Sequence, residues 1–230
     1  MRVVVGCPVY EREWVLSAWF DALDDWRDHV DLHFRFVFTP GDDRTETIIR
    51  NRAENYLIYP YEEGDHSTER NWGKKSRLET MAYMRNFLVT MVELDRPDFF
   101  LSLDSDILVS SWEESKVLFD TLFDAVAPLV YLGPGDVGNA FHYQGDHHRR
   151  IPEARRYGVD QKVDVIAAAK LMKPSAYTQS YYGYDKYGED FYWARQMKEQ
   201  GVTLALNSSV VWKHVMDRDS LYRVDQRLGW

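Results

Sequence analysis

The chain has little cysteine and no long apolar segment. Its 230 residues include a single cysteine, Cys7, so no internal disulfide can form, which is typical of proteins in a reducing compartment. No apolar run approaches the roughly 20 residues that a bilayer-spanning helix needs. The sequence opens on a short valine run instead of a charged leader with a cleavage site. We therefore expect a cytoplasmic protein without a membrane span.

Positively charged residues are fewer than negatively charged ones. Lys and Arg total 28 against 37 Asp and Glu, which gives a formal net charge of -9 at pH 7. This balance opposes general attraction to nucleic-acid phosphates. The stretch 147–156 (HHRRIPEARR) is locally basic, and we interpret it as a solvated loop. Nucleic acid is therefore disfavoured as a partner, although the sequence leaves it open.

Apolar and aromatic residues, by contrast, are plentiful. Hydrophobic residues make up 45% of the chain and aromatic residues 15%, a composition that excludes a disordered or fibrous protein. Most of the aromatic area is expected in a packed core, although rings can also stack on ligands. The length suits one α/β domain.

Apolar runs of strand length alternate with segments of helical periodicity. These patterns predict strands at 3–5, 33–38, 55–59, 99–103, 126–132, 163–169, 202–206 and 209–214, and helices at 14–28, 78–95 and 189–200. Ser111 and Glu114 form a capping box that opens a further helix, and the glycine-rich stretch 133–158 is expected to be a substrate loop. The alternation predicts an α/β fold with a doubly wound, mostly parallel sheet that binds ligands at the carboxyl ends of its strands.

Two aspartates directly follow the predicted strand at 99–103. Asp104 and Asp106 should therefore emerge at the ligand-binding edge of the sheet. Carboxylates this close raise each other's pKa unless they share a cation, such as a divalent ion that bridges them to a diphosphate. His214 ends another predicted strand and could supply a third ligand. A turn with helix-capping aspartates and a structural histidine are the alternatives.

Charged residues also fall on apolar helix faces. Arg85 shares the apolar stripe of its helix, so it should face the sheet and need an anionic partner, either Asp104 and Asp106 or a ligand phosphate. Asp190, with Glu189 beside it, opens a helix on its apolar face. Burial there predicts a raised pKa for Asp190, which suits a general base, while helix capping is the alternative.

Taken in order, these segments resemble the GT-A glycosyltransferases over about residues 1–215. VVVGCPVYERE is similar to the family's first strand and nucleotide-contacting loop, LETMAYMRNFLV to a helix with an Arg-Asn pair, and LSLDSDILVS to its DXD motif. YGEDFYWARQMKEQG resembles the acidic pair that opens a helix, and VVWKHV the terminal strand with a metal-binding histidine. One departure is AAAK at 167–170, where many relatives carry a glycine-rich acceptor strand.

The resemblance implies one GT-A domain at 1–215, with a nucleotide-sugar-binding half at 1–110, an acceptor half at 111–215 and a loosely held tail at 216–230. It implies a UDP- or GDP-sugar donor, an Mn²⁺ or Mg²⁺ ion, and a hydroxyl acceptor on a glycan, a protein or a modified nucleobase.

The resemblance also implies roles for individual residues. Asp104, Asp106 and His214 are expected to hold the metal. Asp190, with Glu189 beside it, is expected to be the catalytic base of an inverting hexosyl transfer. The expected donor contacts are Pro8, Tyr10, Glu11, Asp43, Arg85, Asp104 and Ser105.

Four other functions fit parts of the pattern. A retaining transferase and a catalytically silent binding module stay open as alternatives. A haloacid-dehalogenase-type phosphohydrolase is disfavoured because its aspartates follow the first strand, whereas here they lie at 104 and 106. A nucleotidyltransferase is disfavoured because the opening CPVYERE lacks a glycine-rich basic loop.

Overall fold

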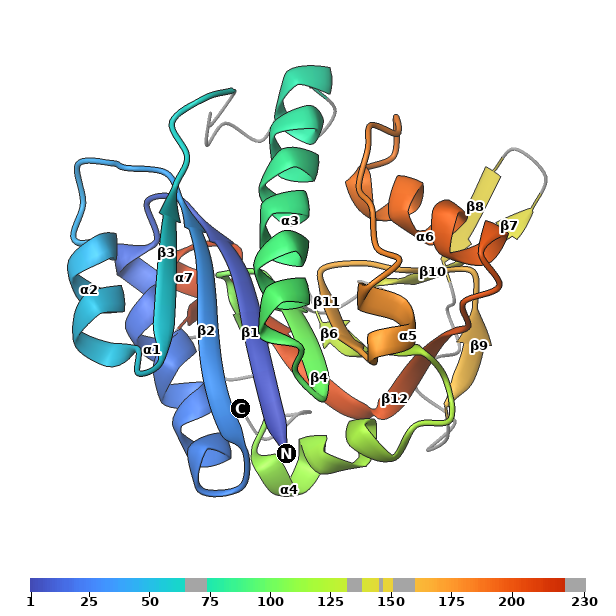
Figure 1. The fold of residues 1–230 in the computed structure, drawn as a ribbon, viewed down its shortest axis with the longest axis horizontal. Coiled ribbons are helices and arrows are strands. Elements are labelled where there is room, and N and C mark those ends of the chain that lie inside the picture. The colour runs from blue at the N-terminus through green and yellow to red at the C-terminus, as the bar shows by residue number, and fades with distance from the viewer. Residues whose placement is uncertain (65–73, 132–137, 145–146, 151–159, 222–230) are drawn as a thin grey trace.

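A nine-stranded mixed sheet organises the computed structural model, which describes residues 1–64, 74–131, 138–144, 147–150 and 160–221 (Figure 1). Its strands are β1 (Arg2–Val9), β2 (Asp31–Phe38), β3 (Tyr56–Pro60), β4 (Phe99–Leu103), β5 (Ile107–Leu108), β6 (Ala125–Tyr131), β9 (Gln161–Val163), β11 (Ala169–Met172) and β12 (Leu204–His214). They are hydrogen-bonded in the order β3-β2-β1-β4-β11-β6-β12-β5, with β9 beside β12. Six strands run parallel and β11, β5 and β9 run against them, which confirms the predicted mostly parallel sheet.

Helices cover both faces of this sheet (Figure 1). One face carries α1 (Glu13–Asp24), η1 (Asp25–Asp28), α2 (Thr45–Arg52), α4 (Trp112–Ser115), η2 (Lys116–Asp120) and α7 (Arg218–Leu221). The other carries α3 (Lys75–Asp95), α5 (Pro174–Tyr177) and α6 (Glu189–Glu199), and α6 also packs on β10 (Val165–Ile166). β10 forms a small second sheet with β7 (Ala140–Gln144) and β8 (His147–Arg150). In the described ranges, no helix combines the length and apolarity needed to cross a bilayer.

Alternation along the central strands supplies both hydrophobic layers. In β1, Val3 and Val5 pack into the layer under α1, while Val4 packs into the layer under α3. Successive side chains of a strand point to opposite faces, so a continuous apolar run is what a strand with helices on both faces requires.

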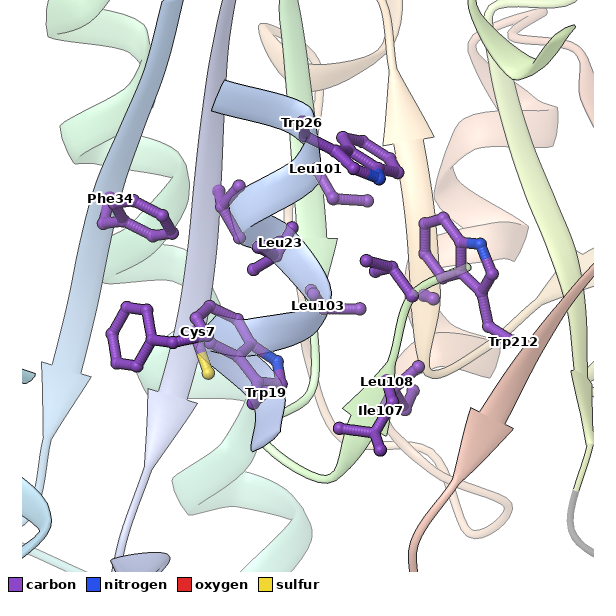
Figure 2. Close-up of a cluster of buried hydrophobic side chains, with 14 of the residues drawn as sticks. Cys7, Trp19, Leu23, Trp26, Phe34, Leu101, Leu103, Ile107, Leu108 and Trp212 are labelled. Atoms are coloured by element: carbon purple, nitrogen blue, oxygen red, sulfur yellow. The ribbon is translucent and has the colours of Figure 1, made fainter. Parts of the chain in front are cut away.

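The layer under α1 also anchors the chain that leaves β4. Figure 2 shows Trp19, Trp26 and Trp212 in this layer together with the side chains of β4 and β5. The Trp19 indole Nε1 donates to the Asp104 carbonyl at 3.2 Å, and the Trp26 Nε1 donates to the Ser110 carbonyl at 3.1 Å. Core aromatic residues thus fix both ends of the turn that holds the predicted metal-binding aspartates.

β1 is longer than the three residues predicted. It continues through Gly6 and Pro8 because β2 pairs with it as far as Val9. Gly6 is not a turn residue: a Cβ there would lie 2.6 Å from Phe100 Cε2, so glycine allows the close approach of β4. Pro8 lies beyond Val3–Gly6, the stretch that pairs with β4, so its missing N–H interrupts no bond between those two strands.

The predicted strand at 163–169 is wrong. The chain there forms β9, β10 and β11, which pair with β12, with β7, and with β4 and β6 respectively. The apolar residues at 163–169 indicate that this stretch is buried. They do not show that its successive parts pair with different strands. Conversely, the strands predicted at 202–206 and 209–214 are one strand, β12, with a register shift between Asn207 and Val211.

Two other segments contain more structure than predicted. The stretch 133–158 includes β7 and β8, although 133–137, 145–146 and 151–158 lie outside the described residues. Its expected role as a substrate loop therefore stays a prediction. Helix α2 was not predicted, because it is short and buries only Thr45 and Ile49, too few apolar positions to show a period.

The other predicted elements agree with the structure to within a few residues, whereas β5, α5 and α7 were not predicted. Helix α3 ends at Arg96, which adopts a left-handed conformation. Ser111 caps α4, its side chain accepting from the Glu114 amide. Gly201, at φ 77°, follows the end of α6.

We predict that Trp19→Phe lowers the free energy of unfolding by about 1–3 kcal/mol, because it removes the bond to Asp104 and leaves unfilled volume in a fully buried position. Urea denaturation should show this loss, with half-buried Trp14→Phe as the control. Equal losses in the two variants would contradict an anchoring role for Trp19.

Candidate active site

The carboxyl ends of the parallel strands meet at one edge of the sheet, and the predicted site residues follow them there. Tyr10 and Glu11 follow β1, Asp43 follows β2, and Asp104–Asp106 follows β4. His214 is the last residue of β12, which runs parallel to β4. The structure therefore brings segments that are up to 200 residues apart to a single edge, where open α/β sheets bind ligands.

Arg85 connects three elements of this edge from the middle of α3. Its side chain is 2% exposed, as its position on the apolar stripe predicts. Nη2 donates to Asp104 Oδ1 at 2.8 Å, Nε to Glu189 Oε1 at 2.9 Å, and Nη1 to Ser102 Oγ at 3.2 Å. In this structure its partners are therefore protein carboxylates, one of the two kinds of partner left open by the sequence.

The two aspartates after β4 have different surroundings. Burial raises the pKa of Asp104, and repulsion from Asp106 adds to this effect, although Arg85 opposes it. Burial also acts on Asp106, but a hydrogen bond from His214 and the charge of Arg12 leave the pKa of Asp106 below its ordinary value. Asp104 is thus hydrogen-bonded to Arg85. Asp106 instead forms a second cluster with His214 and Arg12.

That second cluster is the part of the site that suits a metal ion. Asp106 Oδ1 and His214 Nε2 are 3.3 Å apart. Two adjacent ligands on an octahedral ion with bonds of about 2.1 Å lie roughly 3 Å apart, so these atoms fit. Among the described residues, however, no group of three or more His, Cys, Asp and Glu side chains surrounds one position. The third predicted ligand, Asp104, turns to Arg85 instead.

Arg12 is a site residue that the sequence did not reveal. Its Nη2 lies 3.8 Å from Asp106 Oδ2, and its backbone amide donates to Thr45 Oγ1 at 2.7 Å. The buried Nε has no hydrogen-bond partner in the part of the chain that the structure describes. A buried donor without a partner is costly in a folded protein, and the carboxylate that pairs with this guanidinium is that of Asp106.

The expected donor contacts at the first strand are unequally accessible. Pro8 is buried within β1, and Ser105 is also buried at 5% exposure. Tyr10 and Glu11 are half-buried, and Glu11 adopts a left-handed conformation at φ 47°. Strained backbone of this kind is concentrated at binding sites.

Asp43 binds the backbone of two helices. Its Oδ2 accepts from the Glu13 amide and its Oδ1 from the Thr45 amide, each at 3.0 Å. The carboxylate therefore binds the first backbone amide of both α1 and α2. The two loops that carry Tyr10 and Asp43 are held together by these bonds.

Asp190 is not the high-pKa acid that its helix face predicts. Burial raises its pKa, but the charges of Lys170 and Arg85 outweigh burial, together with hydrogen bonds from Lys170 and the Ala168 amide, so the pKa is lowered. Of the two carboxyls of this pair, Glu189 has the raised pKa, because burial and repulsion from Asp190 exceed the effect of Arg85. The prediction of a raised pKa for Asp190 was wrong because a helix pattern does not reveal a cation on another element.

The Arg-Asn pair of α3 has two separate partners. While Arg85 binds carboxylates, the Asn86 side chain donates to the Tyr182 carbonyl at 2.9 Å and accepts from the Tyr182 amide at 2.8 Å. The Arg85 guanidinium lies 5.7 Å from the Tyr182 ring centroid. Two hydrogen bonds of Asn86 therefore join the segment before α6 to α3. In the sequence, the Arg-Asn pair was the only indication of this contact.

Several solved structures share this architecture. TarS 1-349 from S. aureus in complex with UDP-GlcNAc gives a TM-score of 0.63 at 14% identity, covering 97% of this chain and 62% of that chain. Mannosyltransferase PcManGT from Pyrobaculum calidifontis in complex with GDP-Man and Mn²⁺ gives 0.54 at 18%, covering 93% and 56%. A197 from STIV gives 0.55 at 16%, covering 95% and 87%. The chain has the GT-A fold.

No protein-family model matches this GT-A chain, and no curated protein sequence matches it. At 14 to 18% identity the similarity is one of fold. The chain also spans less than two thirds of the TarS and PcManGT chains.

We predict that Arg85→Met lowers the free energy of unfolding by about 3–5 kcal/mol, because it removes the cation that pairs with buried Glu189 and half-buried Asp104. Arg50→Met is the matched control, since Arg50 forms an exposed i,i+4 pair with Glu46, and exposed ion pairs contribute little to stability. Similar losses in the two variants, measured by urea denaturation, would show that the buried network does not stabilise the fold.

Proposed function

We propose that this chain is a glycosyltransferase that moves a hexosyl group from a nucleotide-sugar donor to a hydroxyl acceptor. One observation carries the proposal: on a GT-A fold, Asp104 and Asp106 follow the central strand β4, and His214 lies 3.3 Å from Asp106 at the same edge. Structural neighbours with UDP-GlcNAc and GDP-Man support a UDP- or GDP-sugar as donor. Residues 1–110 would bind the nucleotide sugar and 111–215 the acceptor.

Asp106 and His214 would hold a divalent ion, Mn²⁺ or Mg²⁺, and Asp104 would join them if its contact with Arg85 opened. When bound, the ion would neutralise charge on the departing diphosphate. Mn²⁺ in the PcManGT and GalNAc-T7 structures supports this choice. Arg12 would contact a phosphate through its guanidinium, whose Nη2 lies 3.8 Å from Asp106 Oδ2.

Donor contacts would come from the loops after β1, β2 and β4. Tyr10 and Glu11 are the half-buried members of this set, so they would meet the nucleoside directly. Asp43 would act by holding its loop against α1. Pro8 and Ser105 would shape the pocket from buried positions.

The acid pair of α6 would activate the acceptor. In an inverting transfer, Asp190 would take the proton of the acceptor hydroxyl while that oxygen bonds to the anomeric carbon and the bond from this carbon to the diphosphate breaks. The lowered pKa of Asp190 keeps the carboxylate ionised at neutral pH. Glu189, with its raised pKa, is the second candidate for this role.

We predict that UDP- or GDP-sugars bind in the presence of Mn²⁺ and lose most of their affinity in excess chelator, because Asp106 and His214 alone leave the diphosphate poorly neutralised. Titration calorimetry measures both conditions. His214→Ala should reproduce the chelator result, whereas His33→Ala, on β2 beside Asp31, should bind as wild type does. Equal affinity with and without chelator would refute the metal site.

We predict that Asp190→Asn lowers kcat by about 10²- to 10⁴-fold with donor affinity retained, since the change removes a proton acceptor but keeps its size. Glu189→Gln, assayed in parallel, should have a smaller effect on kcat. NMR of the product gives its anomeric configuration. Near-wild-type turnover by Asp190→Asn, or retained configuration, would exclude Asp190 as the base of an inverting reaction.

A catalytically silent sugar-nucleotide-binding module is the other candidate, because a fold does not guarantee activity. The two are separated by donor hydrolysis in Mn²⁺: a transferase slowly releases the nucleoside diphosphate with water as acceptor, and a silent module does not.

A further inference from the structure

Lys170 is a fully buried lysine at the centre of the molecule. It lies on β11 opposite Ser102 of β4, with 0% of its side chain exposed. Its Nζ donates to Asp190 Oδ1 at 2.5 Å and lies 5.6 Å and 5.2 Å from the ring centroids of Tyr182 and Trp193. A buried ammonium needs a charge partner, and the two rings offer cation–π contacts in addition.

The same segment of chain contacts both oxygens of Asp190. While Lys170 binds Oδ1, the Ala168 amide donates to Oδ2 at 3.1 Å. Ala168 has φ 66°, a left-handed conformation that disfavours residues with a Cβ. Capping of α6 would pair Asp190 with backbone amides of α6 itself. The donors to Asp190 are instead Lys170 and the Ala168 amide, which lie outside this helix. The turn into β11 is therefore built around the carboxylate of Asp190.

We infer that Lys170 is a positioning residue for the acid pair of α6: its ammonium binds the Asp190 carboxylate and holds it in one orientation at the acceptor side of the site. The inference rests on the proposed function for its catalytic meaning. The ion pair between Lys170 and Asp190 does not depend on that function.

The charges around Asp190 explain why Lys170 matters. Arg85 on α3 lies 3.9 Å away, Glu189 precedes it on α6, Asp104 follows β4, and the Tyr182 phenol lies in the segment before α6. Without Lys170, Arg85 alone would balance the three carboxylates of this group. Removing Lys170 should therefore raise the pKa of Asp190 through burial and repulsion.

The sign of the pH effect follows from this. The pKa of Asp190 is lowered in the folded chain, so its carboxylate stabilises the fold above the unfolded-state pKa, and this stability is lost as pH falls through the folded pKa. In Lys170→Met the pKa of Asp190 moves up. The acid limb of a rate profile that depends on ionised Asp190 then moves to higher pH.

The ion pair is tested without any activity. Lys170→Met, Asp190→Asn and the double variant form a double-mutant cycle in urea denaturation, with exposed Lys162→Met as the charge-matched control. We expect each single change to lower the denaturation midpoint clearly and the double variant to lose less than the sum. Carbon-13 NMR of labelled aspartate should find the Asp190 pKa below its ordinary value in the wild type and raised in Lys170→Met. Additive losses, or a raised pKa in the wild type, would overturn the inference, the latter even if Lys170→Met does not fold.

The catalytic part is tested by the pH dependence of donor turnover. We expect Lys170→Met to lower kcat at least tenfold at neutral pH with donor KM little changed, to move the acid limb upward, and to be partly rescued by Lys170→Arg. An active enzyme whose rate profile is unchanged in Lys170→Met would overturn the positioning role. If the wild type turns over no donor, the proposed function fails, while the cycle and the titration still decide the ion pair.

Discussion

The buried guanidinium of Arg85 is the interaction on which the rest of the site depends. It is placed by the apolar stripe of α3, which packs on β1 and β2, and it joins the end of β4 to the start of α6 through Asp104 and Glu189. These elements are far apart in the sequence. A buried charge without a partner is strongly destabilising. The position of Arg85 on α3 therefore determines where the end of β4 and the start of α6 meet.

Around Arg85 the structure gathers more negative than positive charge. Asp104, Glu189 and Asp190 face Arg85 and Lys170, and next to them Asp106 faces His214 and Arg12. The indoles of Trp19 and Trp26 donate to carbonyls at the two ends of the turn after β4, and this turn carries Asp104 and Asp106. Under the proposed function, this group of carboxylates would suit a divalent cation, which the donor diphosphate would share.

The sequence predicts the sheet, the long helices and most of the candidate site, because burial leaves a period in the chain and the aspartates follow a strand that is easily recognised. It does not predict which strands pair with each other or which side chains from different elements come into contact. The run at 163–169 contributes to three strands that pair with four different neighbours, β12, β7, β4 and β6, and α2 is too short to show a period. The pKa of Asp190 was predicted in the wrong direction for the same reason: Lys170 reaches it from another element, and no local pattern reports a contact across 20 residues.

The most direct test of the account is anomalous diffraction from crystals grown with Mn²⁺ and either UDP or GDP. The account predicts one strong manganese peak between the Asp106 carboxylate and the His214 imidazole, with nucleotide density running toward Tyr10 and Glu11. A peak elsewhere on the molecule, or nucleotide bound at this edge with no manganese beside Asp106, would contradict it.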